Sequence, residues 1–254
     1  MKRHCRKGAL TYKQARNLAK AGTVESLTYD AVNGTITASF AFGISTAINY
    51  AVQRLNGKSQ TEALKASVQE GLKGGTLVFC SSVITSQLAK AGVMDIFIPS
   101  SEALVSAFGK DFAKAVVSST GKQLTQVSSA NLAKSAAGIL RTNALTAAVT
   151  LVVFTVPDAI DLFQGRISQK QFVKNFSVMA VVVFAGTIGS IAGGAAGSFL
   201  VPGVGTIPGT VVGGILAGGL ASAAASLIAD YITDDDADEM YKIIEESFKV
   251  KCEE

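Results

Sequence analysis

The feature that most constrains this chain is the run 175–229, which does not contain a single Asp, Glu, Lys, Arg or His. One helical crossing of a bilayer takes about 20 apolar residues. The run is therefore long enough for two crossings joined by a turn. A pair of soluble helices would be expected to carry charges on the faces that meet water. The run thus favours a membrane environment, with a soluble, fully buried helix pair as the alternative.

Composition points the same way. Hydrophobic residues make up 48% of the 254 residues, and charged residues make up 17%. Soluble domains carry about 25% charged residues. The deficit of charge, together with a mean hydropathy of +0.37, is typical of a protein with several membrane-spanning segments.

Glycines recur every four residues on both sides of Pro202, and this spacing puts each series on one helix face. A glycine inside a helix in water costs about 0.8–1 kcal/mol relative to alanine. In lipid, helices associate through close backbone approach, which a glycine face permits. The pattern predicts a helix-packing face, a glycine zipper, formed by Gly189, Gly193, Gly197, Gly205, Gly209, Gly213 and Gly218. Pro202, Gly203 and Pro208 predict the turn, and the second helix is expected to begin near Gly209.

Three further apolar runs are candidate crossings: 31–53, 143–163 and the shorter 74–89. In the second of them Pro157 predicts a kink. Asp158 and Asp161 follow it, three residues apart and so on one helix face. Acids inside a membrane point to ion or proton handling. The alternative, which we favour, places both acids at the level of the lipid headgroups.

Two similar segments, SQTEALK at 59–65 and SQKQFVK at 168–174, lie one in each half of the chain. Both fit the capping box that opens a helix, with Ser59 and Glu62 in the first and Ser168 and Gln171 in the second. Both follow apolar runs of spanning length. The sequence therefore predicts a two-fold internal repeat of helix-loop-helix units in parallel orientation. Chance recurrence of a common cap is the alternative.

The remaining segments are polar or amphipathic. Positions 1–20 hold seven Lys or Arg, a pattern expected of a cytoplasmic segment beside anionic lipid. Segments 1–20 and 99–141 together hold twelve Lys or Arg, against seven in the two capped connections 54–73 and 164–176, which favours a cytoplasmic N-terminus. Apolar residues every fourth position, Leu104, Phe108, Phe112 and Val116, predict an amphipathic helix at the membrane interface. The acidic tail predicts a soluble helix.

The predicted organisation follows from these segments: a basic cytoplasmic segment (1–26), a first helical hairpin (27–98), amphipathic interfacial helices (99–142), a second hairpin with the glycine-zipper helices (143–232) and an acidic soluble C-terminal helix (233–254).

No constellation for catalysis or metal binding is evident in the sequence. His4 is the one histidine, and Cys5, Cys80 and Cys252 are scattered without a C-x-x-C spacing. A Gly-x-Ser-x-Gly nucleophile motif is absent, and the glycine-rich run on both sides of Pro202 lacks the Gly-Lys-Ser/Thr ending of a phosphate-binding loop. We therefore expect no enzyme, no cofactor and no metal site. The basic residues lack interleaved aromatics, so nucleic acid is not an expected partner.

Residues of about 145–250, an apolar glycine-zipper hairpin flanked by charged helices, resemble poorly characterised bacterial inner-membrane proteins and membrane-acting toxins and effectors. The resemblance implies a bacterial inner-membrane location. Glycine zippers occur in channels, toxins and structural proteins alike, so it carries over no functional residue.

Together these features predict an all-α integral membrane protein with four or five transmembrane helices. The expected function is non-enzymatic, with glycine-zipper helix packing or self-association into a homo-oligomer. The alternatives are a pore-forming or membrane-perturbing effector and, second, a soluble helical interaction protein. The sequence identifies no small-molecule ligand.

Overall fold

The computed structural model describes residues 10–120, 129–200 and 206–231, and over these residues every regular element is a helix. The chain divides into two compact units, Met1–Ile96 and Phe97–Glu254. The all-α class predicted from the sequence is confirmed for the part of the chain described. The predicted acidic helix at 233–254 and the first nine residues lie outside it.

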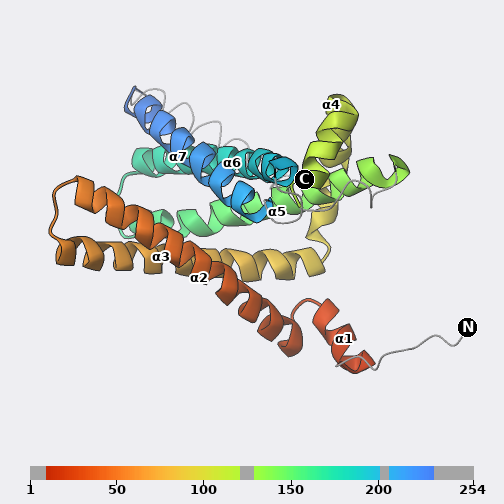
Figure 1. Ribbon diagram of the computed structural model, residues 1–254. Helices are drawn as coiled ribbons and strands as arrows, with labels where there is room; N and C mark the ends of the chain where they lie inside the picture. Colours follow the sequence, from red (N-terminus) through yellow and green to blue (C-terminus); the bar gives the residue numbers. More distant parts are fainter. Residues whose placement is uncertain (1–9, 121–128, 201–205, 232–254) are drawn as a thin grey trace, which may run out of the picture. The chain divides into compact units, whose positions relative to one another are not determined.

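The first unit is a helical hairpin preceded by a short helix. It consists of α1 (Tyr12–Ala19), α2 (Val24–Leu55) and α3 (Gln60–Lys90), and α2 and α3 run antiparallel along each other (Figure 1). Residues 56–59 form the turn, where Gly57 has a φ of 81°. Ser59 caps α3: its Oγ accepts from the Glu62 N–H, and the Glu62 side chain accepts from the Ser59 N–H. The capping box thus sets where α3 begins.

Where the structure describes it, the second unit contains four α-helices, α4 (Ile98–Ser118), α5 (Ser129–Phe163), α6 (Gln169–Leu200) and α7 (Thr206–Tyr231). A short 3-10 helix, η1 (Val93–Phe97), precedes α4. The apolar core lies between α4 and α5 and is made of Val105, Ala113, Val116, Val117, Ala136 and Ala137. Ser168 caps α6 by accepting from the Gln171 N–H at 3.1 Å. The predicted capping box would also pair the Gln171 side chain with the Ser168 N–H, but the Gln171 amide donates to Asn175 Oδ1 at 2.7 Å.

A break at Gly109 divides α4. Its φ of 76° and ψ of −165° lie outside the helical region, and glycine reaches such a φ without the steric cost that a side chain adds. The predicted stripe Leu104–Phe108–Phe112–Val116 spans this break. Leu104 and Phe108 are 44% and 64% exposed, whereas Val116 is fully buried. The Phe108 and Phe112 rings remain neighbours across the break, with centroids 5.1 Å apart, and the interfacial role of the stripe stays a prediction.

Helix α5 also differs from the predicted division of the chain. It runs without interruption from Ser129 to Phe163, so the predicted boundary at 142/143 falls inside a helix. Lys134 and Arg141 lie on the predicted interfacial side of that boundary, but no break in the helix separates them from the apolar run. The helix also continues past Pro157. Helix α7 starts at Thr206, ahead of the predicted Gly209.

Several hydroxyl side chains along α2 are paired within the helix itself, although that of Thr46 is buried without a hydrogen-bond partner. Four of them donate to the carbonyl four residues earlier, at distances of 2.8–3.1 Å: Thr28, Thr35, Thr37 and Ser39. Such bonds satisfy the hydroxyl proton without any partner outside the helix. These four hydroxyl groups of α2 therefore need no hydrogen-bond partner from a neighbouring helix, water or lipid.

Among the described residues, three helices are long and apolar enough to cross a membrane: Val24–Leu55, Asn131–Phe163 and Gln169–Gly197. The pair Gln60–Lys90 and Val93–Ser118 makes a fourth if it is one broken span, and Val212–Ser222 is a shorter apolar helix. The length and composition of these helices indicate a membrane protein.

Candidate functional site

The glycine faces of α6 and α7 meet each other. A Cβ placed on Gly213 would overlap the Gly189 carbonyl oxygen and lie 2.8 Å from the Gly193 Cα. A Cβ placed on Gly189 would overlap the Ala217 Cβ and the Gly213 carbonyl. The two backbones are thus closer than any side chain at these positions would allow.

The contact continues along the hairpin with the same spacing. A Cβ on Gly218 would lie 3.7 Å from the Gly186 Cα and 3.8 Å from the Val182 carbonyl oxygen. A Cβ on Gly214 would overlap Ser190 Oγ. Low numbers on α6 meet high numbers on α7, so the helices are antiparallel. The structure therefore brings Gly189, Gly193, Gly213 and Gly218 of the predicted zipper together.

Gly197 is near the end of α6 and partly exposed. Gly209 lies inside α7, in its first two turns, rather than in the turn between the helices. Gly205 lies outside the described residues.

Sequence reasoning missed a second small-residue interface, between α2 and α3. Buried residues recur every four positions on α3, at Ala63, Ser67, Gly71 and Gly75. A Cβ on Gly75 would lie 3.2 Å from Phe42 Cβ and 3.3 Å from the Ala38 carbonyl oxygen. The pattern Ala-x-x-x-Ser-x-x-x-Gly-x-x-x-Gly could have revealed it, because small residues four apart let helix backbones approach.

A buried polar cluster fastens one end of the same hairpin. Asp30, with 4% of its side chain exposed, accepts from Lys90 Nζ at 2.7 Å through Oδ1 and at 2.8 Å through Oδ2. Lys90 also donates to Ser26 Oγ at 2.8 Å. Gln87 Nε2 donates to Asp30 Oδ2 at 2.5 Å, and Gln87 Oε1 accepts from the Gly22 N–H at 2.7 Å. We name Ser26, Asp30, Gln87 and Lys90 the polar clasp.

The polar clasp resembles a structural ion pair more than a reactive centre. Each carboxylate oxygen of Asp30 accepts from Lys90. The Lys90 Nζ also lies 5.9 Å from the centre of the Tyr29 ring, which is within cation–π range. Two charges with this many partners are held in place, and the clasp fixes the register of α2 against α3.

The predicted intramembrane acids lie at the C-terminal end of α5. Asp161 Oδ1 accepts from Arg166 Nη1 at 2.9 Å, and both side chains are at least partly exposed. Asp158 is one turn earlier and also partly exposed. This position next to the loop 164–168 supports the headgroup-level interpretation of both acids.

A polar cavity of about 210 Å³ lies between α4, α5 and α6. It is lined by Ser119, Thr120, Ile139, Asn143, Thr146, Thr187, Ser190 and Ile191. Four of its hydroxyls, those of Ser119, Thr120, Thr146 and Thr187, donate to backbone carbonyls three or four residues earlier in the chain. The cavity places hydroxyl and amide groups between two helices that are apolar enough to span a membrane.

Within residues 10–120, 129–200 and 206–231, no three His, Cys, Asp or Glu side chains gather closely enough to hold a metal ion. Cys80 is a free thiol of intermediate exposure. No family model matches the chain, and no match was found among curated proteins or solved structures.

Proposed function

We propose that this chain is a non-enzymatic integral membrane protein in which the α6–α7 hairpin is a glycine-packed unit within the bilayer. The observation that carries the proposal is the approach of Gly189 and Gly213, whose backbones leave no room for a Cβ. Contact of this kind buries little apolar side-chain surface, so water gives it a weak driving force. In lipid, close backbone packing is a main source of helix association.

Exposed apolar side chains support the same environment. In the most apolar 18-residue stretch of α6, 0% of the residues are buried, and in that of α2 the share is 6%. Phe184 on α6 is 67% exposed and Leu220 on α7 is 72% exposed. A soluble protein rarely exposes continuous apolar surface of this extent. Lipid tails are the surroundings that such faces fit.

The proposed topology has four or five crossings in a bacterial inner membrane, with the N-terminus in the cytoplasm. Helices α2, α5 and α6 supply three, α3 with the helices that follow supplies a fourth, and α7, with its shorter apolar stretch Val212–Ser222, supplies the fifth. The two hairpins α2–α3 and α5–α6 support an internal repeat. Gly57 and Gly165 each lie two residues past a helix end with φ values of 81° and 69°, and a serine caps the next helix in both.

Packing within one chain is favoured over self-association through the zipper. The faces that carry Gly189 and Gly213 already cover each other, so a second copy would have to bind elsewhere. Gly43 and Gly219, each with no other heavy atom within 4 Å of a built Cβ, are small-residue positions that remain open to such a contact.

Membrane fractionation tests the proposal. After expression of the full chain, we expect it in the membrane pellet, resistant to carbonate and high salt, and soluble only in detergent. Chemical crosslinking of the same membranes should give mainly the monomer. A compact, monodisperse chain purified without detergent would contradict the proposal.

The polar cavity favours a second candidate, a pore-forming or membrane-perturbing protein. Polar groups between spanning helices are the usual lining of an aqueous path. Dye-loaded vesicles separate the two candidates. If the chain has only the proposed packing role, vesicles that contain it should release no more dye than dye-loaded vesicles without protein. Leakage would favour the pore-forming candidate if Asn143→Leu abolishes it. The control Asn131→Leu, at an exposed position on the same helix, should leave that leakage intact.

A further inference from the structure

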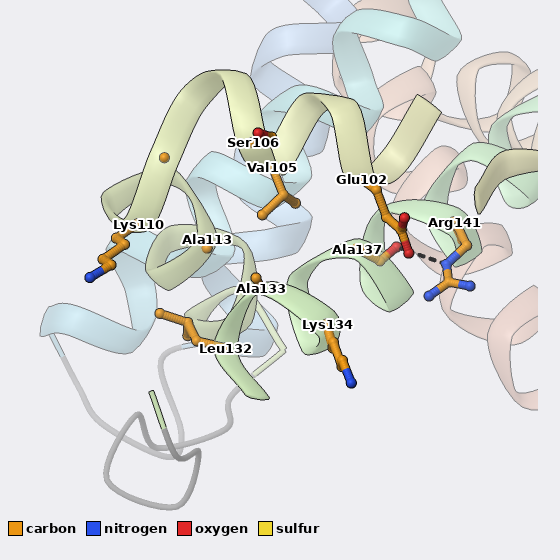
Figure 2. Close-up of a pocket in the computed structure, with 11 residues that line it drawn as sticks. Glu102, Val105, Ser106, Lys110, Ala113, Leu132, Ala133, Lys134, Ala137 and Arg141 are labelled. Atoms are coloured by element: carbon orange, nitrogen blue, oxygen red, sulfur yellow. Dashed lines mark hydrogen bonds between the residues drawn. The ribbon is translucent and has the colours of Figure 1, made fainter. Parts of the chain in front are cut away.

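A larger cavity, of about 700 Å³, lies between α4 and the first turns of α5. Its volume is within the range of roughly 300–1,000 Å³ typical of small-molecule sites. Figure 2 shows side chains from both helices around it, with Val105 pointing inward. All of its lining residues belong to the second unit.

The break in α4 shapes this cavity. Glu102, Val105 and Ser106 line it from before Gly109, and Lys110 and Ala113 line it from after. A continuous helix would present one straight face to α5, whereas a broken helix presents two faces at an angle. The glycine that reaches φ 76° is therefore the residue that opens the space.

The lining has two chemical parts. Val105, Ala113, Leu132 and Ala137 form an apolar floor, and three of them are buried. Lys110, Lys134 and Arg141 are basic and Glu102 is acidic, so three positive charges less one negative leave a formal charge of +2. In Figure 2 Lys110 and Arg141 lie at opposite ends of the cavity. An occupant that complements both parts is an anion with an apolar body.

The position of the cavity along α5 indicates which kind of anion could occupy it. Arg141 is followed by the uncharged stretch 142–157, which measures about 24 Å as a helix. Lining residues on α5 end at Arg141. The cavity thus occupies the part of α5 just outside its apolar stretch, which is the level where lipid phosphates meet Lys and Arg.

We propose that this cavity binds an anionic phospholipid, with its negatively charged headgroup attracted by the basic lining residues Lys110, Lys134 and Arg141 and an acyl chain on the Val105–Leu132 floor. The inference rests on the proposed membrane function and adds a ligand class to it. Glu102 supplies an acceptor for hydroxyl groups of the headgroup, so phosphatidylglycerol is the probe of choice.

The test is native mass spectrometry of the full chain in a non-ionic detergent, with phosphatidylglycerol or phosphatidylcholine of the same acyl chains added. We expect selective retention of phosphatidylglycerol. The triple variant Lys110→Gln, Lys134→Gln, Arg141→Gln should weaken it by about tenfold or more, since each basic residue near an anionic lipid contributes measurably. Ala133→Phe, at an exposed lining position, should weaken it without any change of charge.

The matched control is Arg54→Gln, Lys58→Gln, Lys65→Gln, which removes the same charge from exposed positions of the first unit. It should change retention by less than about twofold. Equal loss in the control, full retention by Ala133→Phe, or displacement of the lipid by inorganic phosphate would each overturn the lipid site. If the triple variant loses helicity by circular dichroism, Ala133→Phe and Lys110→Gln alone decide the matter. The fractionation experiment tests the membrane proposal independently of this site. If the chain proves soluble, short-chain phosphatidylglycerol can still be added to it, so lipid binding is measured whether or not the membrane proposal holds.

Discussion

Lys90→Met is expected to destabilise the α2–α3 hairpin by about 3–5 kcal/mol, the cost of leaving one member of a buried ion pair without its partner. Asp30 is 4% exposed and accepts from Lys90 through both carboxylate oxygens. Methionine fills a similar volume, so lost packing contributes little. Unfolding of the detergent-solubilised chain, followed by circular dichroism during denaturant titration, measures the change.

Lys73→Met is the matched control on the same helix. Lys73 pairs with Glu70 at 2.8 Å, but the side chains are 71% and 50% exposed, so the pair is worth about 0–1 kcal/mol. Adding Asp30→Asn to Lys90→Met should recover much of the loss, because the uncompensated charge is removed. If Lys90→Met and Lys73→Met behave alike, the polar clasp does not hold the hairpin together.

Gly213→Leu is expected to force α6 and α7 apart and to lower the free energy of unfolding by about 1–3 kcal/mol or more, as overpacking does. Even a Cβ at this position overlaps the Gly189 carbonyl. Backbone atoms of α6 cannot move aside as a side chain can. Cysteines introduced at Val182 and Gly218, where a Cβ on Gly218 would lie 3.9 Å from Val182 Cγ1, should crosslink in the parent chain and lose that crosslink in the variant.

Gly219→Leu provides the control, since a Cβ at Gly219 has no other heavy atom within 4 Å. It shares the change in helix propensity but adds no overlap. We expect its stability to stay close to that of the parent chain. Equal destabilisation by the two variants would mean that the close approach of α6 and α7 contributes nothing.

Features that depend on neighbours in sequence could be predicted. The capping box at Ser59 and Glu62 is local and is present in the structure. The glycines of α6 and α7 are four apart on helices joined by a short connection, so their meeting across the hairpin follows from spacing and length. The cap at Ser168 forms only in part, because Gln171 has Asn175 one turn away as a better-placed partner.

Features that depend on register between distant residues could not be predicted. Asp30 and Lys90 lie near opposite ends of the first unit's sequence, and their contact requires the alignment of two long helices, α2 and α3. The break at Gly109 is likewise invisible in the sequence, since the same residue is tolerated inside a helix. The cavity between α4 and α5 follows from that break, and so no sequence pattern indicated its lining.

The internal pairing of hydroxyls on α2 changes how its sequence should be weighed for membrane insertion. Transfer scales count each Thr and Ser as a polar group that must give up water. Where the proton is already bonded to the helix's own backbone, as at Thr35 and Ser39, much of that dehydration penalty has been met before the segment leaves the aqueous phase. Helix α2 should therefore insert into a membrane more readily than the sum of its residue transfer free energies implies. The same correction applies to other threonine-rich segments that such sums exclude as membrane spans.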